Sequence, residues 1–303
     1  MKRVSTLSFV VGGPQCNARC LFCVAKMSGK GYANPKVFGE PNWRNLEIAC
    51  RWACAGESPD VMITGKGEPT LWPEELLAIL RLISKHPFRQ VQLQTNGLLF
   101  LEKPGVYAEH LRKFYEAGLT HICLSTVHFN PERNRELILP HKKPGSYPDL
   151  RELVRFIHQF GFTVRIICTL TKGWIDSPEL VDEEIESVRS WGADQFTMRP
   201  VDFATKDSED SGVYAFAKSH RPSARQLRAI GRHIARGGFL LDVYGHGSEL
   251  YDYKGIGVCV SNAMTVRPQA ESLRQWICYR NGTVTTDWSR HQASILLAGR
   301  SES

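Results

Sequence analysis

Short apolar, β-branched runs alternate along the chain with longer segments in which apolar residues recur every three or four positions. This alternation predicts strands and helices in turn, and therefore a parallel sheet with helices packed against it. The predicted strands are Thr6–Val11, Asp60–Thr64, Gln90–Thr95, His121–Thr126, Thr163–Leu170 and Gln195–Arg199. The predicted helices between them are Asn42–Ala55, Pro73–Lys85, Tyr107–Ala117, Tyr147–Phe160 and Leu180–Trp191.

Six strand–helix units are too few for a closed eight-fold barrel, so the sequence predicts an α/β fold with a partial (β/α)6 TIM-like barrel. Gly118, Gly161 and Gly192 each follow a helical pattern and precede a strand, where a left-handed helix cap is expected. Functional groups in such a barrel belong at the carboxyl ends of the strands.

The pattern changes after about residue 203. We therefore predict a barrel over residues 1–205 and a C-terminal cap or extension over residues 206–303. Within the extension, Ser223–Arg236 is typical of a helix and Phe239–Tyr244 of a strand. Asn281-Gly282 predicts a hairpin turn.

Composition narrows the class of protein. Of 303 residues, 42% are apolar and 23% are charged, as in soluble globular proteins. No apolar stretch reaches the length of a membrane span and no export signal is recognisable, so a cytoplasmic location is expected. Nine cysteines, an odd number, then favour metal binding or redox chemistry over a disulfide framework.

A formal net charge of +7 is compatible with an anionic substrate or with RNA. No long run of lysine and arginine is present, and scattered basic residues are more often solvated surface. Charge alone therefore selects no partner.

The clearest motif, GGPQCNARCLFC, directly follows the first predicted strand. Cys16, Cys20 and Cys23 are separated by three and two residues, a spacing that can place three thiolates on three corners of an iron–sulfur cubane. The fourth iron would keep an open coordination site, which suits catalysis. A zinc site would need a further Cys or His nearby, and none follows soon after Cys23.

The segment CNARCLFC resembles the C-x3-C-x2-C signature of the radical S-adenosylmethionine (SAM) superfamily. The resemblance implies a [4Fe–4S] cluster on the three cysteines, SAM as cofactor and the partial (β/α)6 fold. It also implies that Phe22, the aromatic residue before the last cysteine, lies near the adenine of SAM.

A second segment, ITGKGEPTL, resembles the Gly-Gly-Glu-Pro motif of this superfamily. Gly65, Gly67, Glu68 and Pro69 match it, with Lys66 between the two glycines. The resemblance implies that the Glu68 carboxylate accepts a charge-assisted hydrogen bond from the amino group of SAM.

Later strands offer further matches to the family pattern. QTNG resembles the Thr-Asn-Gly segment beside the cofactor, which implicates Thr95 and Asn96. Ser125, Arg165 and Arg199 stand where polar groups contact SAM, and an inward arginine could pair with the SAM carboxylate or with an acidic substrate group. Structural roles, such as a cap or a salt bridge, stay open for these three residues.

The resemblance implies the reaction as well. Reductive cleavage of SAM at the cluster gives methionine and a 5′-deoxyadenosyl radical, which abstracts a hydrogen atom from the substrate. A reductant such as flavodoxin or ferredoxin would supply the electron.

The remaining cysteines bear on the fate of the substrate radical. Core packing is favoured for Cys50, Cys54, Cys123 and Cys168, although Cys168 is near enough to a strand end to face the site. Three interpretations stay open for Cys259 and Cys278: ligands of a second Fe–S cluster, a hydrogen-atom donor, or packing.

We therefore expect an enzyme that acts on a small, natural-product-like molecule, by epimerisation or another rearrangement. An oxidoreductase with an auxiliary cluster, and an RNA- or peptide-modifying enzyme, are the alternatives. Six aromatic residues are candidates for a pocket or for packing: Trp174, Tyr214, Tyr244, His246, Tyr251 and Trp288.

Overall fold

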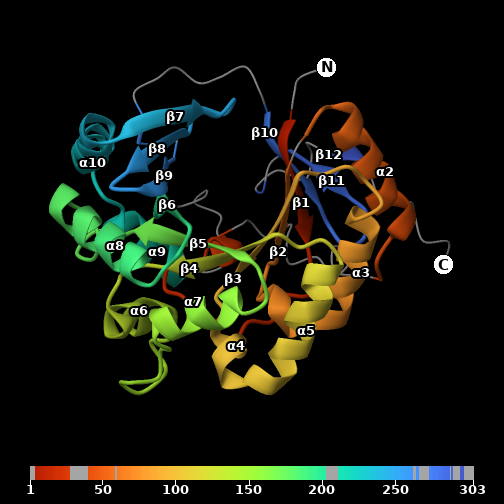
Figure 1. Cartoon of the computed structure of the whole chain (residues 1–303), viewed down its shortest axis with the longest axis horizontal. Helices are drawn as coiled ribbons and strands as arrows, with labels where there is room; N and C mark the ends of the chain where they lie inside the picture. Colours follow the sequence, from red (N-terminus) through yellow and green to blue (C-terminus); the bar gives the residue numbers. More distant parts are fainter. Residues whose placement is uncertain are drawn as a thin grey trace.

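A curled sheet organises the computed structural model, which describes residues 4–27, 40–58, 60–202, 211–261, 264–265, 273–286, 288 and 294–296. Within these residues the strand order is β12-β11-β10-β1-β2-β3-β4-β5-β6-β9-β8-β7 (Figure 1). The parallel strands from β1 to β6 form its middle, and they are β1 (Val4–Val10), β2 (Asp60–Thr64), β3 (Gln90–Thr95), β4 (His121–Thr126), β5 (Thr163–Leu170) and β6 (Gln195–Pro200). The sheet does not close, so the predicted partial barrel is confirmed.

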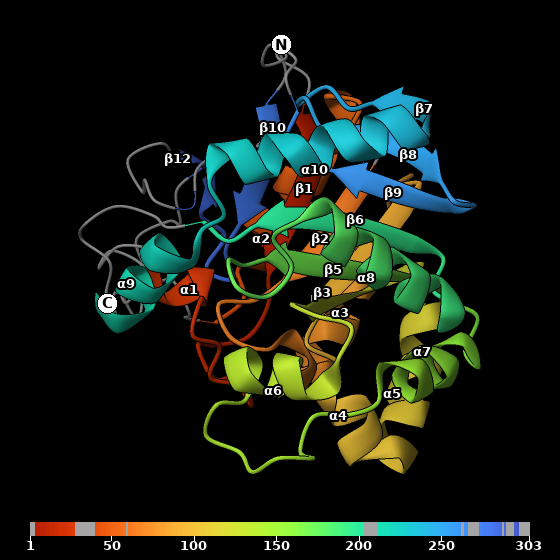
Figure 2. The ribbon, with the colours of Figure 1, turned by 90° about the vertical axis from the view of Figure 1, so that its left-hand side faces the viewer.

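Helices cover the outer face of these strands (Figures 1 and 2). The five predicted ones are present as α2 (Trp43–Ala55), α3 (Pro73–Ile83), α5 (Pro104–Glu116), α7 (Leu150–His158) and α8 (Pro178–Ser190). Their starts follow the expected chemistry. The side chain of Ser177 accepts a hydrogen bond from the Leu180 amide at the start of α8, and Pro178 occupies its first turn.

Short helices were not predicted, because fewer than three turns show too little periodicity to be distinguished from a loop. They are α1 (Val24–Met27), η3 (Pro69–Leu71), α4 (Leu98–Glu102) and α6 (Pro131–Ile138). Each lies after the carboxyl end of a strand, either directly or after a loop. The candidate site lies at these carboxyl ends. Figure 2 shows α1 beside α9 (Ser211–His220), which the contacts between the two helices support.

The C-terminal segment extends the sheet at both edges instead of lying only across the barrel mouth. Strand β9 (Ile256–Val260) pairs in parallel with β6. Beyond β9 in the sheet lie β8 (Glu249–Tyr253) and then β7 (Phe239–Val243), both antiparallel to their neighbours. Helix α10 (Ala224–Gly237) contacts β8. Strand β10 (Leu273–Cys278) pairs in parallel with β1 and continues into β11 (Val284–Thr285) and β12 (Ser294–Leu296). The division of the chain at residue 205 stays a prediction.

The two faces of the sheet differ in chemistry. On β1, Leu7 and Phe9 are buried in the main apolar core between sheet and helices. Ser8 lies between them in the sequence, and its side chain instead donates a hydrogen bond to Gln275 on β10. On β5, Ile166 is likewise buried in that core, whereas the neighbouring Arg165 binds polar partners on β3 and β6. Since side chains alternate along a strand, Ser8 and Arg165 face the barrel interior. In the described part of the chain, no helix is long and apolar enough to cross a membrane.

Candidate active site

The three cysteines of the sequence motif lie on the loop that follows β1, at the carboxyl end of the sheet. Cys16 is exposed, and Cys20 and Cys23 are half-buried. Backbone hydrogen bonds fix this loop on two sides. The Glu68 amide donates to the Gln15 carbonyl at 2.9 Å, and the Arg19 and Leu21 amides donate to the Ile138 and Leu137 carbonyls at the end of α6. The spacing of the cysteines is thus held by two neighbouring elements.

The thiols of this loop act on one another electrostatically. The surrounding protein desolvates the Cys16 sulfur and raises its pKa to about 11, although the residue is exposed, and the charges of Glu68 and Cys23 raise this pKa as well. Burial also raises the pKa of Cys20, with Cys23 and Cys16 adding to the effect. Iron would reverse this penalty, because a bound cation favours the thiolate form.

The residues around the thiols suit a cluster as well. The Ala18 amide donates to the Cys16 sulfur at 3.4 Å, and the Asn96 side-chain amide approaches it at 3.9 Å. Hydrogen bonds of this kind tune Fe–S clusters. Among the described residues, no three metal-ligating side chains yet converge closely enough to hold an ion.

The Glu68 carboxylate joins the loops after β2 and β3. It is 3% exposed, and its Oε1 accepts hydrogen bonds from the Thr70 amide (3.1 Å), the Thr70 hydroxyl (2.7 Å) and the Thr95 hydroxyl (2.5 Å). Its Oε2 accepts one bond, from the Asn96 amide at 3.0 Å. Burial raises the pKa of Glu68, whereas these donors hold it down. Since a carboxylate oxygen has two lone pairs, Oε2 keeps capacity for one further donor.

Gly67 lets the Gly-Lys-Gly-Glu-Pro loop contact the cysteine loop directly. A Cβ atom on Gly67 would lie 1.8 Å from the carbonyl oxygen of Gln15 and 2.6 Å from its carbonyl carbon. Gly65 is also crowded, since a Cβ there would lie 3.0 Å from the Gly67 carbonyl oxygen. Pro69 then opens η3, whose N-cap is Glu68. Both glycines therefore serve close backbone packing.

The segment after β3 completes the connection. The Thr95 hydroxyl, which donates to Glu68, also accepts a bond from the Gly97 amide at 3.0 Å. The Asn96 side chain donates to Asn17 Oδ1 at 2.7 Å and accepts from the Leu98 amide. The three sequence motifs thus form one hydrogen-bonded unit. Asn17 and Thr70 belong to this unit but were not predicted, because the sequence does not show which side chains cross between loops.

Phe22 and Ser125, which were also predicted to contact SAM, differ in their surroundings. Phe22 is half-buried and packs against both the main core and a small cluster that contains Met27 and Val201. Ser125 is exposed near the end of β4, between two buried neighbours, Leu124 and Thr126. Phe22 therefore has a packing role in addition to its predicted contact with adenine.

The predicted arginines lie in the barrel interior. The Arg165 guanidinium donates to Gln195 Oε1 at 2.7 Å through Nε and to Gln92 Oε1 at 2.9 Å through Nη1. Burial lowers the pKa of Arg199 to about 10, and the charges of Arg274 and Arg165 lower it too. Arg274 was not predicted, because its segment showed no recognisable strand pattern.

The cysteines outside the triplet separate into two groups. Cys259 on β9 is half-buried, its neighbour in register is Thr197, and its pKa is raised by burial and held down by Arg165 and Arg199. It therefore faces the interior. Cys278 is buried on the outer face of β10, where its pKa rises through burial and through Cys50 on α2. The structure does not bring Cys259 and Cys278 together.

Cys123 and Cys168 show the same contrast. The Cys123 thiol donates to Gln92 at 3.5 Å on the interior side. Cys168 is in the outer core, where burial and Glu184 of α8 raise its pKa. Cys168, considered in the sequence for the site, faces α8.

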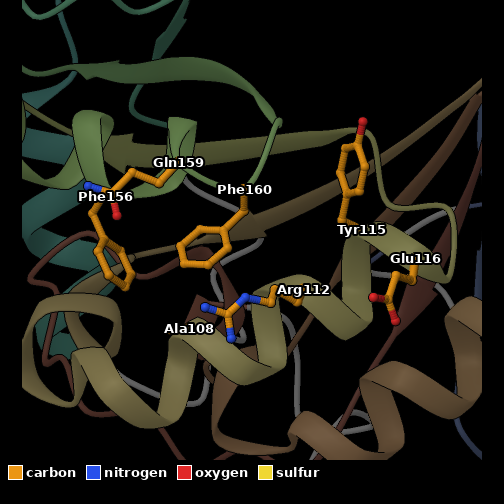
Figure 3. Close-up of a pocket in the computed structure, with 7 residues that line it drawn as sticks. All are labelled: Ala108, Arg112, Tyr115, Glu116, Phe156, Gln159 and Phe160. Carbon is orange, nitrogen blue, oxygen red and sulfur yellow. The ribbon is translucent and has the colours of Figure 1, made fainter.

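A cavity of about 470 Å³ lies away from these residues, between α5 and α7 (Figure 3). Arg112, Tyr115, Phe156 and Phe160 are among the residues that line it, with the Arg112 guanidinium 5.7 Å from the centre of the Phe160 ring. Since both helices cover the outer face of the sheet, this cavity is separate from the cysteine loop.

Comparisons with known proteins agree with the geometry. The sequence model of the Radical SAM superfamily matches residues 10–183, more than half of the chain. A curated relative, GTP 3′,8-cyclase from Aquifex aeolicus (strain VF5), is 28% identical over 169 residues, which cover 55% of this chain and 48% of the relative. The chain thus spans about half the length of this relative.

Solved structures share the fold. SuiB from Streptococcus suis bound to the precursor peptide SuiA has a TM-score of 0.62 and 16% identity, covering 99% of this chain and 62% of that one. The enzyme anSMEcpe with bound AdoMet has a TM-score of 0.52 and 15% identity, covering 77% of this chain and 60% of that one.

The Gly67 contact gives a direct test of the site. We predict that Gly67→Ala displaces the cysteine loop, lowers the free energy of unfolding by about 1–3 kcal/mol and reduces bound iron after anaerobic reconstitution severalfold. The control is Gly105→Ala on α5, because a Cβ at Gly105 would meet no atom within 4 Å. Iron content and chemical denaturation measure both effects. Equal iron in the two variants would show that this contact does not hold the cysteine loop.

Proposed function

The chain belongs to the Radical SAM superfamily, and on that premise we propose that it abstracts a hydrogen atom from a small molecule in the barrel interior and that Cys259 returns one. Enzymes of this superfamily use a [4Fe–4S] cluster and SAM. When bound, these cofactors supply a 5′-deoxyadenosyl radical at the expense of one electron from an external reductant, such as flavodoxin or ferredoxin.

The residues at the barrel mouth would bind these cofactors. Cys16, Cys20 and Cys23 would hold the cluster through three thiolates. Glu68 would accept a hydrogen bond from the SAM amino group through Oε2, the oxygen that accepts only one bond within the protein. The support for this role is the hydrogen-bonded unit that joins Glu68 to the cysteine loop.

Further contacts to SAM follow from position. Phe22 lies on the cysteine loop, where it would approach the adenine. Asn96 is close to both Cys16 and Glu68, and the exposed Ser125 hydroxyl would be available for a polar group of SAM. Arg199, near the end of β6, is a candidate partner for the SAM carboxylate or for the substrate.

The orientation of Cys259 is the observation that favours a hydrogen-donor role. In the proposed reaction, a hydrogen atom leaves the substrate carbon for the 5′-deoxyadenosyl carbon. The Cys259 S–H bond then breaks, and its hydrogen atom forms a new C–H bond on the opposite face of the substrate. The sulfur radical takes one electron from the external reductant and one proton from water, which restores the thiol. The product is an epimer of the substrate.

The alternatives are supported less well. An auxiliary cluster on both C-terminal cysteines would need them on one face of the sheet, whereas Cys278 packs toward Cys50 and Cys259 faces the interior. A small substrate is favoured over RNA or a peptide because the curated relative is named for a small molecule, GTP, and because the thiol lies inside the barrel. The likeness to a peptide-binding enzyme is at 16% identity and concerns the fold.

The reaction class is tested by SAM cleavage. Reconstituted wild-type protein, reduced with dithionite, should convert SAM to 5′-deoxyadenosine and methionine, whereas the variant with alanine at Cys16, Cys20 and Cys23 should form neither. Chromatography with mass detection measures both products. Cleavage by the triple variant, or none by a wild type that contains reducible iron, would contradict the assignment.

The hydrogen-donor role is tested by paired variants. Enzyme, SAM and reductant are incubated in D2O with a pool of small metabolites, and mass spectrometry follows SAM-dependent uptake of one deuterium into a metabolite. We expect uptake with wild type and Cys278→Ala, and at least a hundredfold less with Cys259→Ala, which should still cleave SAM. Uptake retained by Cys259→Ala would refute this role.

A further inference from the structure

The cysteine loop carries an exposed positive charge next to its thiols. Arg19, directly before Cys20, is exposed, and residues 12–27 contain no acidic residue. The Arg19 amide donates a hydrogen bond to the Ile138 carbonyl at 3.0 Å, and this bond holds the end of α6 beside the loop (Figure 2). The segment that follows α6 in the chain therefore begins next to the cysteine loop.

That segment adds two exposed cations, Lys142 and Lys143. Hydrogen bonds to its backbone hold it on α6. The Lys142 amide donates to the Leu139 carbonyl at 2.9 Å, and the Lys142 carbonyl accepts from the Arg135 guanidinium at 3.2 Å. The Lys142 side chain takes part in neither bond. Arg19, Lys142 and Lys143 are named the basic patch below.

Protein carboxylates do not neutralise the basic patch. Among the described residues, none of its three cations has a carboxylate oxygen within 4.0 Å. The acidic residues of α6 have other partners, since Glu132 pairs with Arg135 at 2.8 Å and Glu136 pairs with Arg133 at 2.7 Å. Asp149, the next acidic residue along the chain, caps the start of α7. The surface beside the thiols therefore keeps its positive charge.

His141 lies between these cations in the sequence but adds no charge at neutral pH. Desolvation lowers its pKa from the usual value, and the charges of Arg19 and Lys142 lower it further. An effect of both cations on one ring agrees with the backbone contact that joins their two segments. The charge of the basic patch is thus set by its arginine and lysines alone.

We propose that Arg19, Lys142 and Lys143 dock the external reductant, an acidic one-electron carrier protein such as a flavodoxin, against the cysteine loop. One electron passes from the carrier, which is oxidised, to the cluster, which is reduced, and no bond forms or breaks. This inference rests on the proposed function for the cluster and names the surface that its reductant uses. Complementary charges steer such encounters and raise the rate of association.

Position selects an electron carrier over other anionic partners. An electron reaches a cluster only from a donor close to it, and the basic patch adjoins the loop that carries all three thiols. A second row of exposed cations on α10 has the same sign but lies on a helix that packs against β8 and α8, away from the cysteine loop (Figure 2). Its members are Arg225, Arg228, Arg232 and Arg236. This row provides a matched control of equal charge.

Binding of a flavodoxin tests the docking surface directly. Labelled flavodoxin is titrated with the reconstituted protein, and fluorescence anisotropy gives the Kd at low ionic strength. We expect Lys142→Glu/Lys143→Glu to raise this Kd at least tenfold, and Lys142→Arg/Lys143→Arg to leave it unchanged because the arginines keep the charge. Arg228→Glu/Arg232→Glu makes the same change of charge on the exposed face of α10 and should have little effect.

Electron transfer provides a second readout. Stopped-flow absorbance should show the cluster of Lys142→Glu/Lys143→Glu reduced at least tenfold more slowly by reduced flavodoxin than that of the wild type. Photoreduced deazaflavin, a small reductant that needs no docking surface, should reduce both at the same rate. Added salt should slow the flavodoxin reaction of the wild type more than that of the variant, because it screens the exposed charges.

Several results would overturn the proposal. It is wrong if the charge-reversed pair binds flavodoxin as tightly as the wild type, or if the α10 control weakens binding equally, because net charge would then explain the effect. Slower reduction by both reductants would show that the lysines support the cluster instead of docking. Loss of binding of a labelled tRNA, with flavodoxin binding unchanged, would assign the basic patch to nucleic acid.

SAM cleavage driven by deazaflavin separates this inference from the proposed function. Cleavage by a wild type whose flavodoxin binding does not depend on Lys142 and Lys143 removes only the docking surface. Flavodoxin binding that depends on both lysines, in a protein that cleaves no SAM, removes only the proposed function.

Discussion

The site depends on one buried carboxylate. Glu68 accepts four hydrogen bonds from the loops after β2 and β3, and its own amide binds the cysteine loop. A buried carboxylate without these donors would be strongly destabilising, so the loops and the charge stabilise each other. Gly67 makes the arrangement possible, because only a residue without a side chain can approach the Gln15 carbonyl so closely. Loops from three strands are thereby joined at one mouth, and such support favours holding a cluster and its cofactor in a fixed geometry.

The barrel interior carries polar groups, among them Arg165, which donates hydrogen bonds to the side chains of Gln92 and Gln195. Strands β9 and β10 pair with the two edges of the six parallel strands, and β9 carries Cys259 on its inner face. The C-terminal segment therefore contributes to the interior wall as well as to the edges of the sheet. A mouth joined by hydrogen bonds, next to an interior that carries the Cys259 thiol, is consistent with a preorganised cofactor site beside the proposed substrate site.

The central barrel was predictable because its signals are local. Strands β2, β3, β4 and β5 have the predicted limits, since each is a short segment of apolar or alternating apolar and polar residues between turn residues. Strands β8, β9 and β10 were not predicted: they contain Gly, Tyr and charged residues, and they form by pairing with distant partners. For the same reason the motifs identified Cys16, Glu68 and Asn96, whereas the inward Cys259 and outward Cys278 could be told apart only in three dimensions.

Cys16, Cys20 and Cys23 would hold a [4Fe–4S] cluster whose remaining iron is free to bind SAM. The most direct test is pulsed EPR on the reduced, reconstituted protein with SAM labelled by 15N at its amino group. We expect about four irons per chain and a 15N hyperfine coupling to the cluster spin that is absent without SAM. A reducible cluster that shows no nitrogen coupling, or a protein that takes up no iron, would contradict it.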